Sequence, residues 1–78
     1  MTVADDVYDL IDELAQYMIK QPELITIVAD LLAGYLVLSH KNECNLVLDT
    51  INKLETFPND RIHELINKIR DECTHDGV

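Results

Sequence analysis

Five carboxylate side chains lie within the first thirteen residues and form the densest group of the chain that could do chemistry: Asp5, Asp6, Asp9, Asp12 and Glu13. On a helix they fall within about 120° of one another around the axis. No basic residue precedes Lys20. Such a face attracts a basic partner protein, imitates a nucleic-acid backbone, or keeps the chain in solution. The sequence leaves these three readings open.

Residues that could catalyse a reaction are few and poorly spaced. Ser39 adjoins His40, but adjacent residues do not face each other on a helix. No phosphate-binding loop, nucleotide fingerprint or HExxH motif is present. The carboxylates are expected on solvent faces, away from apolar neighbours that would shift their pKa. We therefore predict that the chain is not an enzyme and that it has no catalytic or cofactor-binding residues.

Two cysteines, Cys44 and Cys73, are 29 residues apart and lack the CxxC spacing of metal sites. A zinc site that combines them with His63 and His75 would therefore have no recognisable motif, and no metal is predicted. In an oxidising compartment a disulfide between them would add roughly 3–4 kcal/mol through loop entropy. We interpret both cysteines as reduced thiols that act as small apolar residues, buried on helix faces.

The elements that position these residues are predicted to be helices, because apolar residues recur at three- and four-residue intervals throughout. Thr2 and Asp5 predict a capping box at the start of the first helix. Pro22 is predicted to be the first residue of the second helix, and Asn59 or Asp60 is predicted to cap the last helix. On helix 60–73, Lys68 is expected to pair with Glu64. The four predicted helices are residues 3–19, 22–38, 43–56 and 60–73.

The predicted fold is all-α and occupies residues 1–78 as a single domain, with residues 74–78 as a loose tail. Short connections make neighbouring helices antiparallel. The simplest architecture is an up-down four-helix bundle, or three helices with the first docked across them.

The second helix has more apolar surface than a peripheral helix can bury. Twelve of its residues 24–38 are apolar. It is therefore either the central helix or part of a contact with another chain. Gly34 lies inside it, either for close approach of another helix or on its polar stripe. The candidate residues for a dimer or partner interface are Ile25, Leu32, Leu36 and Val37.

Charge and hydropathy exclude several classes of protein. The net charge is −9, and residues 1–39 contain one of the six basic residues. Such a chain repels nucleic acid and anionic membranes. The N-terminus lacks the basic region and cleavage site of a signal peptide, and the apolar run, with Asp30 at its centre, is shorter than a bilayer requires. The expected location is the cytoplasm.

Size and charge resemble those of acyl carrier proteins, but the second helix opens with PELITIV rather than a DSL motif, and the lone Ser39 lies in LSHK at its end. That assignment is rejected. The helix order is similar to that of bacteriocin immunity proteins, and the size and charge to those of small phage-encoded inhibitors. Neither resemblance has a motif, so no residue is carried over.

These patterns predict a regulator, inhibitor or immunity-type protein, phage- or plasmid-borne, that docks a basic partner. One alternative is a self-assembling module that dimerises through the second helix. A weaker alternative is a DNA-mimic inhibitor.

Overall fold

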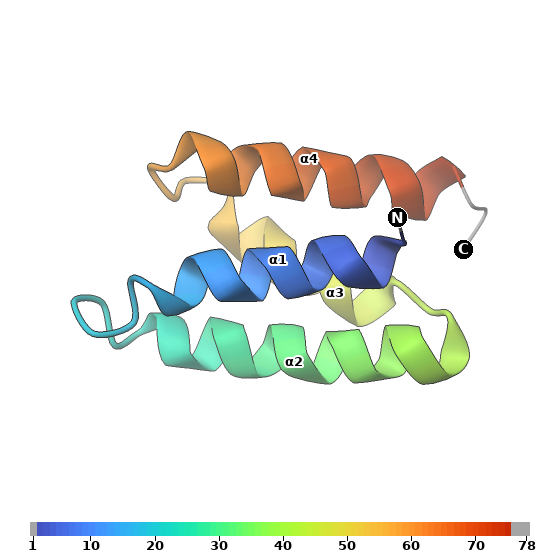
Figure 1. The fold of residues 1–78 in the computed structure, drawn as a ribbon, viewed down its shortest axis with the longest axis horizontal. Helices are drawn as coiled ribbons and strands as arrows, with labels where there is room; N and C mark the ends of the chain where they lie inside the picture. The colour runs from blue at the N-terminus through green and yellow to red at the C-terminus, as the bar shows by residue number, and fades with distance from the viewer. Residues whose placement is uncertain (1, 76–78) are drawn as a thin grey trace.

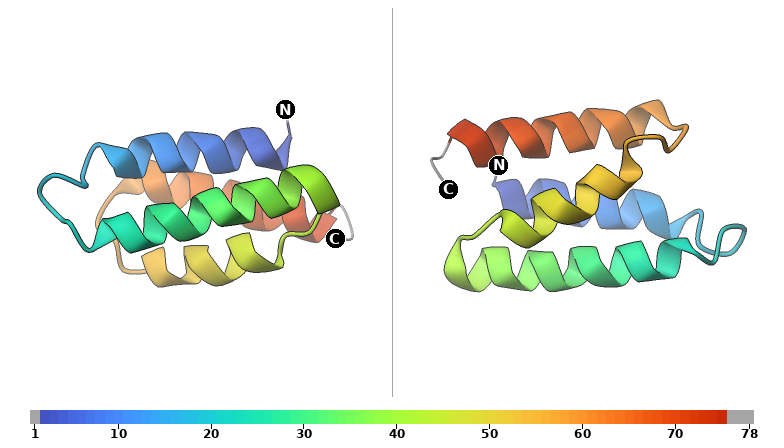
Figure 2. Two further views of the ribbon diagram at one scale, coloured as in Figure 1. Left: turned by 90° about the horizontal axis from the view of Figure 1, so that it is seen from below. Right: turned by 180° about the vertical axis from the view of Figure 1, so that it is seen from behind.

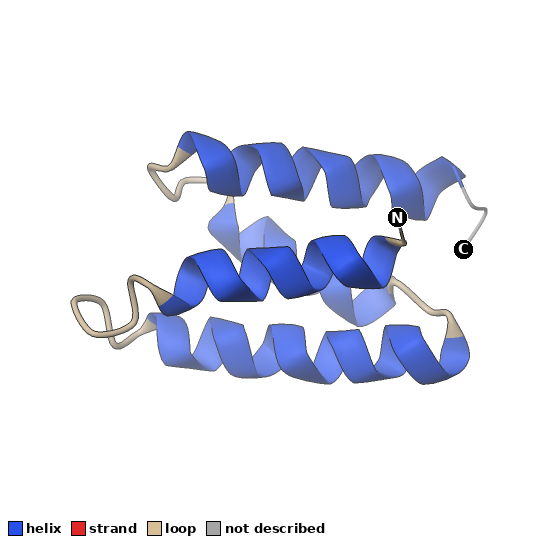
Figure 3. Cartoon of the chain, viewed as in Figure 1, coloured by secondary structure: helices blue, strands red, loops and turns tan. Residues whose placement is uncertain are grey.

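The computed structural model describes residues 2–75 and contains four α-helices and no strand within that range (Figures 1 and 3). The helices are α1 (Val3–Ala15), α2 (Leu24–Lys41), α3 (Asn45–Ile51) and α4 (Asp60–His75), with a single 3-10 turn, η1 (Asn52–Leu54), after α3. The predicted all-α bundle is confirmed.

The helices pack as a compact antiparallel bundle in which α1 lies between α2 and α4 (Figure 1). Helix α3 crosses behind them and packs on α2 (Figure 2). The core between these elements is aliphatic, and its fully buried residues include Leu10, Leu14, Leu31, Ile51 and Ile66. Helix α2 lies at an edge of the bundle, so it is covered on one side only.

Helix α1 begins as predicted and ends earlier than predicted. The Asp5 amide donates to Thr2 Oγ1 at 3.2 Å, and the Thr2 amide donates to Asp5 Oδ2 at 3.3 Å, so the capping box is formed. The helix stops at Ala15 instead of residue 19. The Tyr17 ring beyond it packs edge-on against Phe57 at 5.4 Å, and the Tyr17 hydroxyl accepts a hydrogen bond from Asn59. These tertiary contacts hold residues 16–20 in turns.

Helix α2 begins two residues later than predicted, because Pro22 and Glu23 lie in a turn closed by the Leu24 and Ile25 amides. It continues to Lys41, where Asn42 adopts the left-handed conformation with φ 55° and ends the helix. The predicted helix 43–56 is in fact the shorter α3 followed by η1.

Gly34 is buried at the contact between α2 and α3. A Cβ atom at this position would lie 2.8 Å from Val47 Cγ2 and 3.3 Å from the Val47 backbone nitrogen. Of the two readings of this glycine, the structure supports close approach of another helix. The backbones of α2 and α3 approach each other at this point because no side chain separates them.

Helix α4 is capped by Asn59, whose Oδ1 accepts from the Ile62 amide at 3.0 Å. It runs through Thr74 and His75, which were expected in the tail. Residues 76–78, the rest of that predicted tail, lie outside the described residues. Near the end of α4, Cys73 is joined in a disulfide to Cys44, and both are buried. The expectation of reduced thiols is therefore wrong for this structure, although their burial is confirmed.

Candidate functional site

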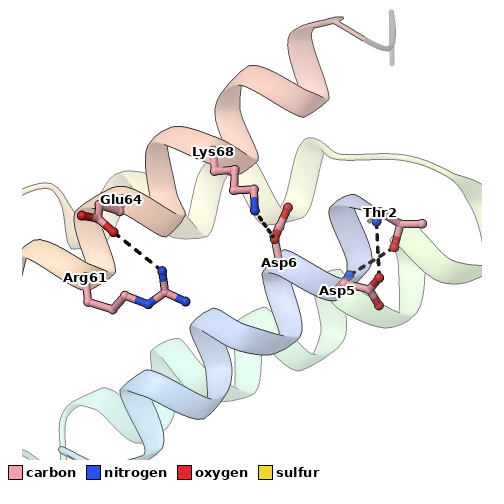
Figure 4. A network of polar contacts seen from close by, with 6 residues as sticks. All are labelled: Thr2, Asp5, Asp6, Arg61, Glu64 and Lys68. Carbon is pink, nitrogen blue, oxygen red and sulfur yellow. Dashed lines mark hydrogen bonds and ion pairs between the residues drawn. The ribbon is translucent and has the colours of Figure 1, made fainter.

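The acidic residues of α1 divide into one that is buried and four that are not. Asp6 is 0% exposed and faces α4, where its Oδ1 lies 3.3 Å from Lys68 Nζ (Figure 4). Neither of its oxygens has hydrogen-bond geometry toward any group of residues 2–75. The prediction that Asp6 belongs to a solvent-accessible acidic face is wrong. Its side chain joins two helices inside the fold.

The same contact changes the partner predicted for Lys68. Glu64, expected to pair with it along α4, is instead 3.6 Å from Arg61, three residues earlier (Figure 4). Lys68 is half exposed and reaches across to α1. The buried carboxylate therefore has one cation beside it, the pairing that a buried charge requires.

The remaining four acids form what we term the acidic edge: Asp5, Asp9, Asp12 and Glu13. Asp5 and Asp12 are exposed, while Asp9 and Glu13 are half-buried. Asp5 belongs to the cap, and Glu13 accepts a hydrogen bond from Gln16 at 3.3 Å. None of the four takes part in a salt bridge within residues 2–75. The acidic edge is therefore an uncompensated negative surface.

Helix α2 carries two apolar seams, which lie one residue apart along the sequence. The inner seam faces the bundle and is buried except for the half-buried Tyr35: Leu24, Val28, Leu31, Tyr35 and Leu38. The outer seam is exposed along its whole length: Ile25, Ala29, Leu32 and Leu36. Both have the alternating four- and three-residue spacing by which a helix packs against another helix.

Three of the four residues predicted for an interface lie in this outer seam. Ile25, Leu32 and Leu36 are 54%, 47% and 56% exposed, which is unusual for three large aliphatic side chains on one helical face. Val37, the fourth, is half-buried and lies about 100° further round the helix. The structure thus groups the first three and separates Val37 from them.

An exposed tyrosine connects the outer seam to the acidic edge. Tyr8 is 58% exposed, and its ring lies 6.2 Å from that of Tyr35. Tyr35 follows Leu32 by three residues on α2, so the two side chains are neighbours on the helix surface. Asp5 and Asp12 lie one turn before and one turn after Tyr8 on α1. An apolar strip on α2 therefore continues through two aromatic rings to carboxylates on α1.

Two of the three histidines contact the backbone. The rings of His40 and His63 contact the carbonyl oxygens of Leu36 and Phe57, at 2.9 and 2.6 Å. Within the part of the chain described, no three His, Cys, Asp or Glu side chains are placed to hold a metal ion.

Length and composition alone would allow α2 to cross a membrane, the one such helix among residues 2–75. The expectation that its apolar run is too short is thus not upheld on those criteria. Its inner seam, however, packs against α1 and α3, and Asp30 pairs with Lys53 of η1, just after α3, at 3.6 Å. In this structure α2 packs one side against the core and lies at an edge of the bundle, so it is not the central helix.

Comparisons of the chain with protein families, curated proteins and solved structures return no match. The functional interpretation therefore rests on the surface itself. Sequence reasoning missed Ala29 and Tyr8 as members of that surface. The four–three–four spacing of the exposed apolar residues on α2 would have indicated Ala29, whereas Tyr8 is placed by a contact between helices.

Proposed function

We propose that this chain is a non-enzymatic protein that acts by binding a basic partner protein, as a regulator, inhibitor or immunity-type protein. The observation that carries the proposal is the acidic edge of α1, on which no carboxylate has a cationic partner among the described residues. Like charges on one helix destabilise it, so selection for stability alone would not concentrate them. A cationic partner would relieve this repulsion on binding.

The test neutralises the acidic edge away from the helix start, with Asp9→Asn, Asp12→Asn and Glu13→Gln. A matched control neutralises three exposed acids elsewhere, with Glu23→Gln, Glu43→Gln and Asp49→Asn. Both variants have the same net charge. Each is cross-linked to bound proteins in extract of the native cell at low salt. A basic protein lost by the first variant and retained by the control supports the proposal, and equal retention contradicts it.

The alternative is a self-assembling module, and the open outer seam of α2 is the observation that favours it. Salt separates the two, because docking between opposite charges weakens as salt rises, whereas association through apolar surface between two acidic chains does not. A DNA mimic is a narrower form of the first proposal. It would require the partner to release DNA when this chain binds.

A cytoplasmic location is part of the proposal and has a consequence for the disulfide. In a reducing compartment, Cys44 and Cys73 would be thiols, and the bundle would have to fold without the bridge. Cells are quenched in acid, free thiols are alkylated under denaturing conditions because both cysteines are buried, and the mass of the protein is measured. Two modified cysteines support a cytoplasmic location, and none supports an oxidising compartment.

A further inference from the structure

The outer seam of α2 has the dimensions of a helix-binding surface. Its four residues span three turns, about 16 Å at 1.5 Å per residue. Of the exposed residues beside it, Thr26, Ala33 and Ser39 carry no charge, and the ring of His40 contacts the Leu36 carbonyl oxygen one turn beyond the seam. Small Ala29 and Ala33 leave room between the larger side chains, so a second helix can approach closely. The seam has the spacing of the inner seam, which is already occupied by helices of the bundle.

The two borders of this seam differ in charge. On the α1 side, the Tyr35 and Tyr8 rings lead to Asp5 and Asp12, which have no cationic partner within residues 2–75. On the α3 side, Asp30 is already paired with Lys53 at 3.6 Å. An occupant of the seam therefore meets two carboxylates without a salt bridge along the α1 border, and a carboxylate that is already paired, Asp30, along the α3 border.

A second copy of this chain fits the seam poorly. In an antiparallel two-fold pair, the axis lies perpendicular to both α2 helices, so it keeps both α1 helices on one side of the interface. The acidic edges would then approach and repel each other. A parallel pair would place like helix ends together. The net charge of −9 opposes either arrangement.

We infer that the outer seam of α2 binds one amphipathic helix of a basic partner protein, whose apolar stripe packs on Ile25, Leu32 and Leu36. The lysine or arginine residues of this partner helix line its edge nearest α1. Asp5 and Asp12 are seven residues apart, so basic residues at about seven-residue spacing match them. This inference rests on the proposed function and specifies the part of the partner that is bound.

The test uses two synthetic helices of about 18 residues, held helical by side-chain staples and matched in length to α2. Both carry leucines at four–three–four spacing, and they differ only in having Lys or Glu along one edge. We expect the Lys helix to bind at least about tenfold tighter at low salt, with the difference shrinking as salt rises. Amide chemical shifts should change along the outer seam and around Tyr8.

Two variants locate the site, and each has a matched control. Leu32→Gln should weaken binding of the Lys helix, whereas Leu46→Gln, at an exposed leucine of α3, should not. Asp12→Asn should weaken it, whereas Asp49→Asn on α3 should not. Equal affinity of the two synthetic helices, shifts on another surface, or no binding at millimolar concentration would each overturn the inference.

Two other occupants of the outer seam, a second copy of this chain and a membrane surface, are tested by direct binding measurements. A dimer in sedimentation equilibrium that Leu32→Gln abolishes would assign the seam to a second copy. Binding to zwitterionic lipid vesicles that Leu32→Gln abolishes would assign it to a membrane surface. Either result overturns the inference. The extract experiment tests the proposed function separately. If a basic protein is lost with the neutralised acidic edge and retained by the control variant, the proposed function stands even when the seam inference fails.

Discussion

The inner and outer seams of α2 have the same spacing and a similar aliphatic composition, yet their surroundings are opposite. Leu31 is fully buried, while its neighbour Leu32 is 47% exposed. The difference arises because α1 and α3 both pack on the same side of α2. Helical periodicity identifies both seams equally well. The number of helices available to cover them decides which one the fold uses.

The largest expected effect comes from placing the same charge on each seam. Leu31→Asp puts an unpaired carboxylate in the core, and we expect it to cost more than about 4 kcal/mol and to unfold the domain. Leu32→Asp should change the free energy of unfolding by about 0.5–1 kcal/mol at most. Urea titrations followed by circular dichroism measure both. A cooperative transition for Leu31→Asp near that of wild type would break the comparison.

The second expected effect concerns the disulfide, which ties Cys44, the residue before α3, to Cys73 near the end of α4. The loop-entropy model gives roughly 3–4 kcal/mol for a closed loop of this length. We expect Cys44→Ala with Cys73→Ala to lose about that amount. Amide exchange should become fastest in α3, because its seven residues cannot hold a helix alone. Unchanged stability would show that packing suffices.

The sequence predicted the number of helices, the Thr2 cap and the apolar excess of α2. It did not predict what depends on contacts between distant segments. Asp6 lies within the acidic arc of the helical wheel, and Lys68, from the far end of the chain, places it in the interior. The disulfide likewise depends on how α3 and α4 are arranged. Local spacing contains neither piece of information.

A third prediction compares a buried ion pair, Lys68 with Asp6, and an exposed ion pair, Arg61 with Glu64. Lys68→Met leaves the Asp6 carboxylate buried without a cation, and we expect a loss of roughly 2–3 kcal/mol, reduced because Lys68 is half exposed. Arg61→Met breaks an exposed pair and should cost less than about 0.5 kcal/mol.

Adding Asp6→Leu to Lys68→Met should restore most of the lost stability, because the uncompensated charge is then gone. Thermal melts of the three variants in one buffer measure these differences. Equal losses for Lys68→Met and Arg61→Met would show that water reaches Asp6. Asp6 would then belong with the acidic edge after all.

The smallest expected effect sharpens the comparison of the covered and open sides of α2 at two adjacent residues. Gly34 is buried against Val47, and Ala33 beside it is exposed. Helix propensity alone predicts that Gly34→Ala gains about 1 kcal/mol. The added methyl, however, would lie 2.8 Å from Val47 Cγ2, and a buried β-branched side chain has no free rotamer with which to move away.

We therefore expect Gly34→Ala to lose about 1–2 kcal/mol, because overpacking outweighs the propensity gain. Ala33→Met adds more atoms one residue earlier, where they project into solvent, and should change stability by less than about 0.5 kcal/mol. Urea midpoints with a common slope measure both variants. A stabilised Gly34→Ala would mean that α3 can retreat from α2. The covered side of α2 would then be as adaptable as the open one.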